Sequence, residues 1–235
     1  MIIYTISDLH LPLGIDKPMD IFGRRWENYV EKIEYNWKNT VKDDDIIVLG
    51  GDFSWATYLE ESEKDFAFLH SLPGEKILLK GNHDYWWTTH SKLKKFMEEK
   101  DFSTISFLHN NSYLAGNIGI CGTRGWSLDS ITSAEDKKIY ERELLRLKLS
   151  IDDAKAKGAE RIFVFTHFPP VTNQLQSTAF HNILKEEKVE KCIYGHLHGI
   201  SHKNAFEGIV DGVEYTLASG DFTCFELIKL EEICI

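Results

Sequence analysis

The chain has 235 residues, of which 43% are hydrophobic and 27% are charged, so it is long enough to bury a sizeable core and has an ordinary globular composition. Its formal net charge is −10 and no basic tract is visible, which argues against a broad surface for duplex nucleic acid. No apolar run approaches the roughly 18 residues of a membrane helix, and residues 1–4 lead into a strand-like run instead of a leader peptide. We therefore expect no membrane anchor and no duplex nucleic-acid partner.

The cysteines are far apart and show no CxxC spacing; they are Cys121, Cys192, Cys224 and Cys234. Free thiols in a reducing cytoplasm are the simplest interpretation of this pattern. No repeat, low-complexity linker or shift in composition marks a boundary, so we expect residues 1–235 to form a single domain. The sequence does not indicate an oligomeric state.

Strand-like runs alternate with helical patterns along the first half of the chain. Short β-favouring or apolar runs at 2–7, 46–49 and 77–79 predict buried strands. Helical spacing of apolar residues predicts helices from Trp26 to Trp37, over 60–69 and over 91–100. Residues 11–25 have no periodicity and are rich in glycine and proline, which predicts a loop long enough to form a rim or lid over a site.

The second half continues in the same manner. Runs at 112–115 and 118–122 around a Gly116-Asn117 turn predict a hairpin. The longest helix is expected over 135–157, with Gly158 as its C-cap. Further predicted elements are a strand at 161–166, a helix at 179–187, a strand at 191–194, and antiparallel strands at 213–218 and 222–230.

Five of the strand-like runs end in clusters of metal-ligating or proton-transferring residues. In chain order the clusters are Asp8/His10, Asp52, Asn82/His83/Asp84, His167 and His196/His198. Alternation along a strand would place Asp8 and His10 on the same side. Carboxyl ends of parallel strands meet at one edge of a sheet, so the five clusters are expected to converge. The acidic triplet at 43–45 precedes its strand and is expected to be a solvated loop at the opposite edge.

Each cluster alone has an ordinary structural explanation, such as a turn aspartate or a satisfied histidine. Together they supply imidazole nitrogens with carboxylate and amide oxygens, a mixture that suits Mn, Fe, Zn, Ni or Co better than Mg or Ca. No thiolate cluster indicates a structural zinc site. The joint pattern therefore favours a transition-metal centre.

The order and spelling of these blocks resemble the calcineurin-like metallophosphoesterases, whose signature is DxH, GD, GNHD or GNHE, a lone H, and GHxH. Every block is present here, as Asp8-Leu9-His10, Gly51-Asp52, Gly81-Asn82-His83-Asp84, His167 and Gly195-His196-Leu197-His198. The resemblance implies an α/β fold, a four-layer α/β/β/α sandwich of two mixed sheets flanked by helices. It places a two-metal site at the carboxyl ends of the central strands.

The resemblance also implies a ligand set for two divalent or trivalent transition-metal ions. Asp52 would bridge the ions, Asp8, His10 and His198 would complete one, and Asn82, His167 and His196 would complete the other. Ions held about 3.5–4 Å apart can share a hydroxide that attacks phosphorus in line.

His83 has no place in that ligand set. Next to Asn82, it is a candidate general acid or transition-state donor to the leaving oxygen, with a structural turn histidine as the alternative. Asp84 is expected to orient the His83 ring and to support its protonated form. Asn82 and Arg124 are candidate substrate contacts, although a surface salt bridge is an equally good interpretation of Arg124.

Several aromatic residues flank the motifs and could stack on a base or pack the loops; they are Tyr85, Trp86, Trp87, Trp126, Phe168 and Phe222. The histidines without motif context are expected to be ordinary ones; they are His70, His90, His109, His181 and His202. The predicted function is a dinuclear metal-dependent phosphoester hydrolase. A small phosphodiester or nucleotide-like substrate is favoured by the acidic charge and the aromatics. The alternatives are a phosphomonoesterase, a Ser/Thr phosphoprotein phosphatase, or a non-catalytic interaction module.

Overall fold

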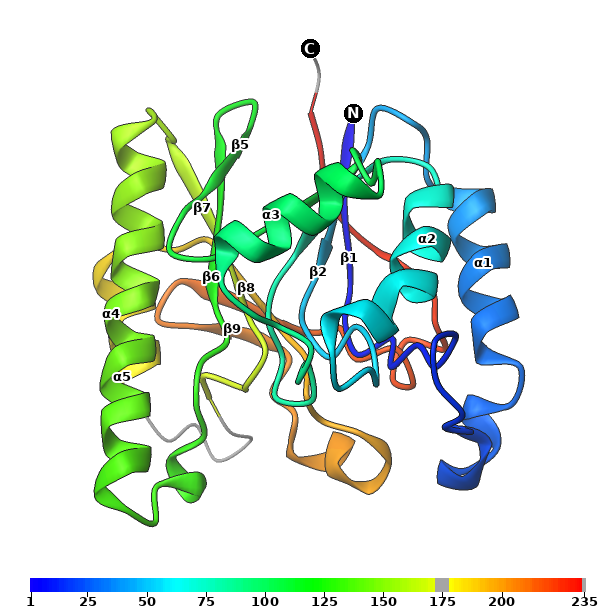
Figure 1. Cartoon of the computed structure of the whole chain (residues 1–235). Coiled ribbons are helices and arrows are strands. Elements are labelled where there is room, and N and C mark those ends of the chain that lie inside the picture. The colour runs from blue at the N-terminus through cyan, green and yellow to red at the C-terminus, as the bar shows by residue number, and fades with distance from the viewer. Residues whose placement is uncertain (172–177, 234–235) are drawn as a thin grey trace.

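The computed structural model describes residues 1–171 and 178–233, which form two mixed β-sheets packed face to face (Figure 1). The first sheet has the order β11-β1-β2-β3-β4. Its strands are β1 (Ile2–Ile6), β2 (Ile46–Leu49), β3 (Glu75–Leu78), β4 (Ile105–Phe107) and β11 (Ile228–Glu232). The strands β1 to β4 run parallel, and β11 pairs antiparallel with β1.

The second sheet has the order β5-β6-β7-β8-β10-β9. Its strands are β5 (Tyr113–Ala115), β6 (Ile118–Thr123), β7 (Arg161–Thr166), β8 (Lys191–Tyr194), β9 (Gly208–Val210) and β10 (Val213–Leu217). The strands β6, β7, β8 and β10 are parallel, while β5 and β9 pair antiparallel at the two edges.

Helices cover the outer face of each sheet, so the molecule has the expected four α/β/β/α layers (Figure 1). The helices α1 (Tyr29–Thr40), α2 (Glu63–Ser71) and α3 (His90–Glu99) contribute to the core outside the first sheet. The helices α4 (Ala134–Ala156) and α5 (Ala179–Glu186) cover the second. Short 3₁₀ turns are η1 (Asp20–Phe22), η2 (Arg24–Trp26), η3 (Leu59–Ser62), η4 (Leu128–Ser130) and η5 (Gly199–Asn204). No helix in the described ranges is both long and apolar enough to cross a membrane.

The central strands read as continuous apolar runs because both of their faces are buried. A core between the sheets contains Ile3, Val48, Ile77, Phe163 and Phe165, each of which is almost inaccessible to solvent. Two further cores lie between each sheet and its helices. Cys121, Cys192 and Cys224 are free thiols, as predicted, and Cys234 lies outside the described residues.

The predicted tail strands are partly wrong. The strand β10 is parallel to β8 and antiparallel to β9, whereas β11 joins the other sheet, so the two do not pair with each other. Residues 222–227 form no strand, and Cys224 and Phe225 adopt left-handed backbone angles. This turn lets the chain cross from one sheet to the other, a long-range connection that local alternation does not encode.

Two local predictions also need correction. The first helix begins at Tyr29 and not at Trp26, because Asn28 has a left-handed φ of 51° that separates it from η2. Asp45, expected in a solvated loop, is buried and accepts hydrogen bonds from the amides of Ile2 (2.6 Å) and Lys42 (2.9 Å). Its carboxylate therefore ties the start of β1 to the turn before β2.

Phe165 tests the importance of the core between the sheets. We expect Phe165→Ala to lower the free energy of unfolding by about 3–5 kcal/mol, because a fully buried aromatic side chain leaves a cavity that the two sheets cannot close. Urea unfolding followed by circular dichroism measures the loss. Tyr35→Ala on the exposed face of α1 serves as the control and should change stability by less than about 0.5 kcal/mol. Equal effects of the two substitutions would contradict this account of the core.

Candidate metal centre

The parallel strands deliver the predicted polar clusters to one edge of the molecule, the lower edge in Figure 1. Asp8 and His10 follow β1, Asp52 follows β2, and Asn82 follows β3 of the first sheet. His167 follows β7 and the pair His196/His198 follows β8 of the second sheet. The site therefore lies where the carboxyl ends of both sheets meet.

One set of donors gathers around His10 and His198. The Nε2 atoms of the two rings lie 3.4 Å apart, and His198 Nε2 lies 3.3 Å from Asp8 Oδ1. Asp8 and His10 are buried, and the three residues form a group whose ligand atoms all lie within 4.8 Å of one another. Nitrogen and oxygen atoms this close fit a shared cation.

A second set gathers around Asn82. Its Oδ1 atom lies 2.6 Å from His167 Nε2 and 2.9 Å from His196 Nδ1. His167 Nε2 also lies 3.4 Å from Asp52 Oδ2. All seven predicted ligands are thus brought together in two neighbouring sets.

Asp52 lies between the two sets. Its Oδ2 atom is 3.8 Å from His10 Nε2 and 3.4 Å from His167 Nε2. Its Oδ1 atom accepts a hydrogen bond from the His83 amide, whereas Oδ2 is buried and has no hydrogen-bond partner among the described residues. Asp8 belongs to both carboxylate–imidazole groups able to hold an ion, one with His10 and His198 and the other with Asp52 and His167. A buried carboxylate oxygen without a partner is costly, and a cation would satisfy it.

The electrostatics of the site favour bound positive charge. Burial, together with the negative charges of Asp84 and Asp8, raises the pKa of Asp52 well above its ordinary value. Burial lowers the pKa of His167 to about 3, so that its ring is the neutral form that ligates metals. Burial opposes a charge on His198, yet hydrogen bonds to Asp221 and Asp8 raise the pKa of His198 to about 10. The buried carboxylates thus attract a cation, and transition-metal ions suit this mixture of nitrogen and oxygen donors.

The route by which Asp8 and His10 meet differs from the predicted one. Strand alternation does not apply, because Asp8 (φ 60°) and His10 (φ 46°) have left-handed backbones beyond the end of β1. Asp52 and His196 share this conformation. It costs a non-glycine residue roughly 1–2 kcal/mol, so the site stores backbone strain that the surrounding packing sustains.

Two motif glycines are required by the close approach of neighbouring loops. A Cβ atom at Gly81 would lie 2.1 Å from Asp52 Oδ1, and one at Gly195 would lie 2.3 Å from Asp8 Oδ2. Both distances are impossible contacts. The glycines therefore let the carboxylates of one loop lie against the backbone of another.

Asp221 is a residue of the site that the sequence analysis missed. Its Oδ1 atom lies 2.8 Å from His198 Nδ1, and its carboxylate also accepts from the Gly199 amide and lies 3.3 Å from His202 Nε2. His202, expected to be ordinary, therefore belongs to the surroundings of the centre. On the other side His167 Nδ1 lies 3.1 Å from the Gly50 carbonyl. Partners of this kind fix which ring nitrogen faces a metal.

Asp84 does not orient His83, which corrects the prediction. Its buried carboxylate accepts hydrogen bonds from the amides of Asp52 (2.9 Å), Phe53 (2.9 Å) and Gly81 (2.7 Å), and from Trp86 Nε1 (3.0 Å). The His83 ring is not among these partners. His83 Nδ1 is buried and has no hydrogen-bond partner in the described chain. Asp84 thus holds together the loops that carry Asp52 and Asn82.

The loop at 11–25 forms part of the rim of the site and contributes Lys17, a second residue that the motifs did not reveal. Lys17 Nζ lies 3.1 Å from the centroid of the Trp55 ring. Trp55 stacks on His10 with ring centroids 4.5 Å apart and lies 4.8 Å from the His83 ring. Burial, followed by the charge of Lys17, lowers the pKa of His83.

The flanking aromatics have different surroundings. Trp86 is buried in the core beside the first sheet, and Trp87 and Phe222 pack against cores. Phe168 is buried against His196, with ring centroids 4.3 Å apart. Tyr85 is 62% exposed and lies edge-on to His83, so it is the aromatic best placed to meet a substrate.

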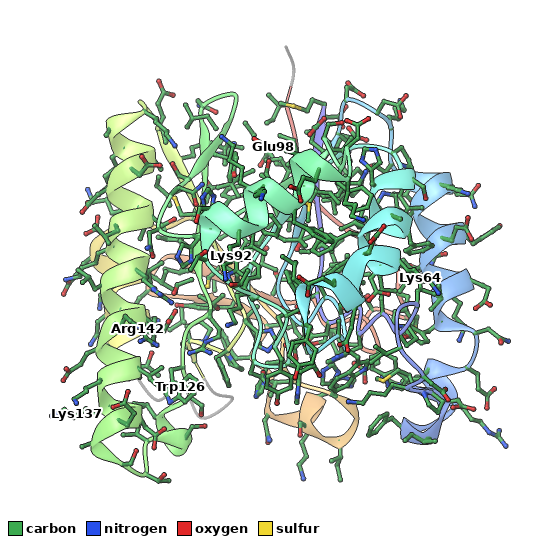
Figure 2. The ribbon with its side chains drawn as sticks, in the orientation of Figure 1. Lys64, Lys92, Glu98, Trp126, Lys137 and Arg142 are labelled. Carbon is green, nitrogen blue, oxygen red and sulfur yellow. The ribbon has the colours of Figure 1, made fainter. Side chains whose placement is uncertain are left out.

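Arg124 forms a salt bridge with Glu143, one of the two predicted alternatives, but this salt bridge is largely buried and does not lie on the surface. Its side chain is only 16% exposed, its Nη2 atom lies 3.9 Å from Glu143 Oε1, and its guanidinium lies 4.6 Å from the centroid of Trp126. The Arg124 carbonyl accepts hydrogen bonds from the amides of His167 and Phe168. Figure 2 shows Trp126 near the lower part of α4, on the side of the molecule where Arg142 also lies.

Comparison with known protein families matches residues 1–199 to the calcineurin-like phosphoesterases. The chain therefore belongs to this family, whose members are metal-dependent phosphoesterases. The match ends before Asp221, β10 and β11. No curated protein sequence is significantly similar to the chain.

Solved structures share the fold at low sequence identity. A protein of unknown function from Aquifex aeolicus is 19% identical with a TM-score of 0.52, and the match covers 97% of this chain and 95% of that one. The phosphopantetheinyl hydrolase of Mycobacterium tuberculosis is 13% identical with a TM-score of 0.54, at the same coverage. A Thermus thermophilus protein is 14% identical with a TM-score of 0.54, covering 97% of this chain and 98% of that one. These similarities concern the fold alone.

Asp221 offers a test of the support around His198. We expect Asp221→Asn to weaken metal binding about 10- to 100-fold, because the His198 ring loses the carboxylate that fixes its orientation and increases its basicity. Titration of the metal-free protein with Mn²⁺ or Zn²⁺ by calorimetry measures the change. Asp211→Asn, which alters a histidine–aspartate pair on His181 away from the site, is the control. If both variants bind metal like the parent chain, Asp221 does not support the centre.

Proposed function

We propose that the protein is a dinuclear metal-dependent phosphoester hydrolase with a small phosphodiester or nucleotide-like substrate. The observation that carries the proposal is the convergence of seven nitrogen and oxygen donors on Asp52, whose Oδ2 atom is buried without a hydrogen-bond partner among the described residues. Asp8, His10 and His198 would hold one ion, Asn82, His167 and His196 the other, and Asp52 both.

Two bound ions would supply an acidified water as nucleophile and would polarise the phosphoryl oxygens. The chain positions the donors through contacts outside the ligand set. Asp221 and the Gly50 carbonyl fix the rings of His198 and His167, and Asp84 fixes the loop of Asp52. Asn82 is a neutral ligand, so it leaves more of the positive charge available to the substrate.

His83 would assist departure of the leaving oxygen. Its ring lies 5.8 Å from that of His10, and among the described residues its Nδ1 atom has no hydrogen-bond partner and no carboxylate forms an ion pair with it. This supports a role as a hydrogen-bond donor, or as an acid that gives up its proton readily, over one as a permanently charged imidazolium. Lys17 would add positive charge beside the phosphoryl group, and Arg124 is a candidate contact to another part of the substrate.

The preference for a small substrate rests on charge and shape. The net charge of −10 disfavours polyanionic partners, and exposed Tyr85 beside His83 offers a flat surface for a base or another ring. A phosphomonoesterase and a phosphoprotein phosphatase are the alternatives within the same chemistry. Rates on a monoester, a diester and a phosphopeptide distinguish them.

Asp52 tests the whole proposal. Substitutions outside the ligand set reduce metal affinity or activity about 10- to 100-fold. We expect Asp52→Asn to reduce both by more than this, because it weakens ligation of both ions at once. Metal content and hydrolysis of bis-p-nitrophenyl phosphate with Mn²⁺ are the measurements. Asp44→Asn, whose side chain is 67% exposed, is the matched control. If the parent protein binds no divalent metal under any loading condition, the proposal is refuted. That result would favour the non-catalytic module instead.

His83 tests the assistance to the leaving group. We expect His83→Ala to keep its metals and to lose about 10²–10⁴-fold in kcat on alkyl phosphodiesters, with a smaller loss on p-nitrophenyl esters, whose leaving group needs little help. His70→Ala is the control, because His70 pairs with Thr104 at the start of the strands. Equal losses on both ester types would remove this role from His83 without affecting the metal centre.

A further inference from the structure

A cavity lies beside the loop of the metal centre, at the same carboxyl edge of the sheets. Its volume is about 420 Å³, within the range of roughly 300–1,000 Å³ that small-molecule sites occupy. Its walls follow β3 at Leu79 and Lys80, β4 at Leu108 and His109, and β6 at Arg124, with α4 behind. Lys80 immediately precedes the Gly81-Asn82 loop of the metal centre, so the cavity and the centre share a wall.

The cavity carries excess positive charge in an acidic protein. Its charged lining consists of three cations, Lys80, Arg124 and Arg146, against the single carboxylate of Glu143, while the whole chain has a net charge of −10. Burial lowers the pKa of His109, which leaves that ring neutral. Two positive charges therefore remain uncompensated by the lining.

Glu143 is already satisfied and does not account for all three cations. Its side chain is buried, accepts a hydrogen bond from Thr123 Oγ1 at 2.6 Å, and pairs with Arg146 Nη1 at 2.8 Å. Arg124 makes only a long ion pair with Glu143, at 3.9 Å and beyond hydrogen-bond distance, and its buried Nε atom has no hydrogen-bond partner in the described part of the chain. The Lys80 side chain has no hydrogen bond or ion pair within the described ranges, although the charges of Asp84 and Glu143 favour its cation.

An uncompensated, partly buried pair of cations is unfavourable unless an anion binds it. A phosphate monoester carries about −1.5 to −2 charge at pH 7, which matches the excess. Arginine and lysine are the side chains that proteins use for such groups, the former as a planar fork and the latter as a point charge. The Trp87 ring and the threonines of the same lining add an apolar wall and hydroxyl groups.

We propose that this cavity binds a second, non-reacting phosphate of the substrate, held by Lys80 and Arg124 while the first phosphate reacts at the metal centre. The inference rests on the proposed function and makes it more specific, since the preferred substrate is then a phosphodiester that carries a further phosphate group. Arg146 keeps Glu143 neutralised and so leaves Lys80 and Arg124 available to the anion.

A matched pair of chromogenic substrates tests the proposal on the metal-loaded full chain. The 5′-p-nitrophenyl ester of thymidine 5′-phosphate is compared with the same ester carrying a 3′-phosphate; in both, water attacks the 5′-phosphorus and p-nitrophenolate leaves. We expect kcat/KM to be at least about tenfold higher for the second compound, the contribution of one charge-assisted hydrogen bond. In Lys80→Gln and Arg124→Gln the two compounds should have similar kcat/KM values, which differ by less than about threefold.

Lys64→Gln is the control, because Lys64 is an exposed lysine on α2, on the opposite side of the molecule from α4 (Figure 2). It should keep the parental ratio. Thermal unfolding of each variant separates loss of the phosphate contact from loss of fold. Equal kcat/KM for the two compounds in the parent chain, or an unchanged ratio in both folded cavity variants, would overturn the inference.

Direct binding separates this inference from the proposed function. Calorimetry with thymidine 3′,5′-bisphosphate should show binding to the parent chain that weakens at least about tenfold in Lys80→Gln. If neither chromogenic ester is hydrolysed with any metal but this Lys80-dependent binding persists, the proposed hydrolase activity fails and the anion site stands. Binding of equal strength in the parent and both cavity variants would refute the site itself.

Discussion

The arrangement of the centre depends on one buried carboxylate that is not itself in the ligand set. Asp84 accepts hydrogen bonds from four backbone amides and the Trp86 indole, which together span the loops after β2 and β3. Without an acceptor those buried amides would be unsatisfied, and the loops would have no common anchor. The carboxylate thus holds two strand ends together, so that the side chains of Asp52 and Asn82 both lie beside His167 Nε2.

The same edge concentrates negative charge. Asp8, Asp52 and Asp84 are all buried within a few residues of strand ends; His198, whose pKa is raised, pairs with Asp8, and the neutral His167 ring lies beside Asp52. Of these three carboxylates, Asp52 has an oxygen, Oδ2, without a hydrogen-bond partner among the described residues, and a bound cation would offset the cost of burying it. Several ligands have left-handed backbones, and two motif glycines are in close contact with neighbouring loops. The packing of the sheets therefore sustains considerable backbone strain at the site.

Apolar runs predicted most helices and strands and the convergence of the polar clusters, because they report local constraints, whereas the four layers and the set of seven donors followed from the resemblance of the motifs to a known family. The sequence patterns did not predict Asp221. This residue lies in a turn after β10, and only the folded structure brings that turn next to His198. Sequence reasoning assigned Asp84 to His83 by adjacency, whereas the buried amides of another loop determine its partners. Lys17 and the Lys80–Arg124 cavity also depend on long-range packing that carries no periodic signal.

The return of β11 to pair with β1 has a consequence for folding. The N-terminal strand, which begins the centre, is flanked on one side by a strand formed from residues 228–232, the last segment of the described chain to be synthesised. Pairings of such high sequence separation form slowly, because a long loop must close before any contact is gained. The donors are also far apart in sequence, as the contact of His10 with His198 shows, so the complete donor set exists only after both sheets have packed together, and binding of metal would be coupled to that step of folding.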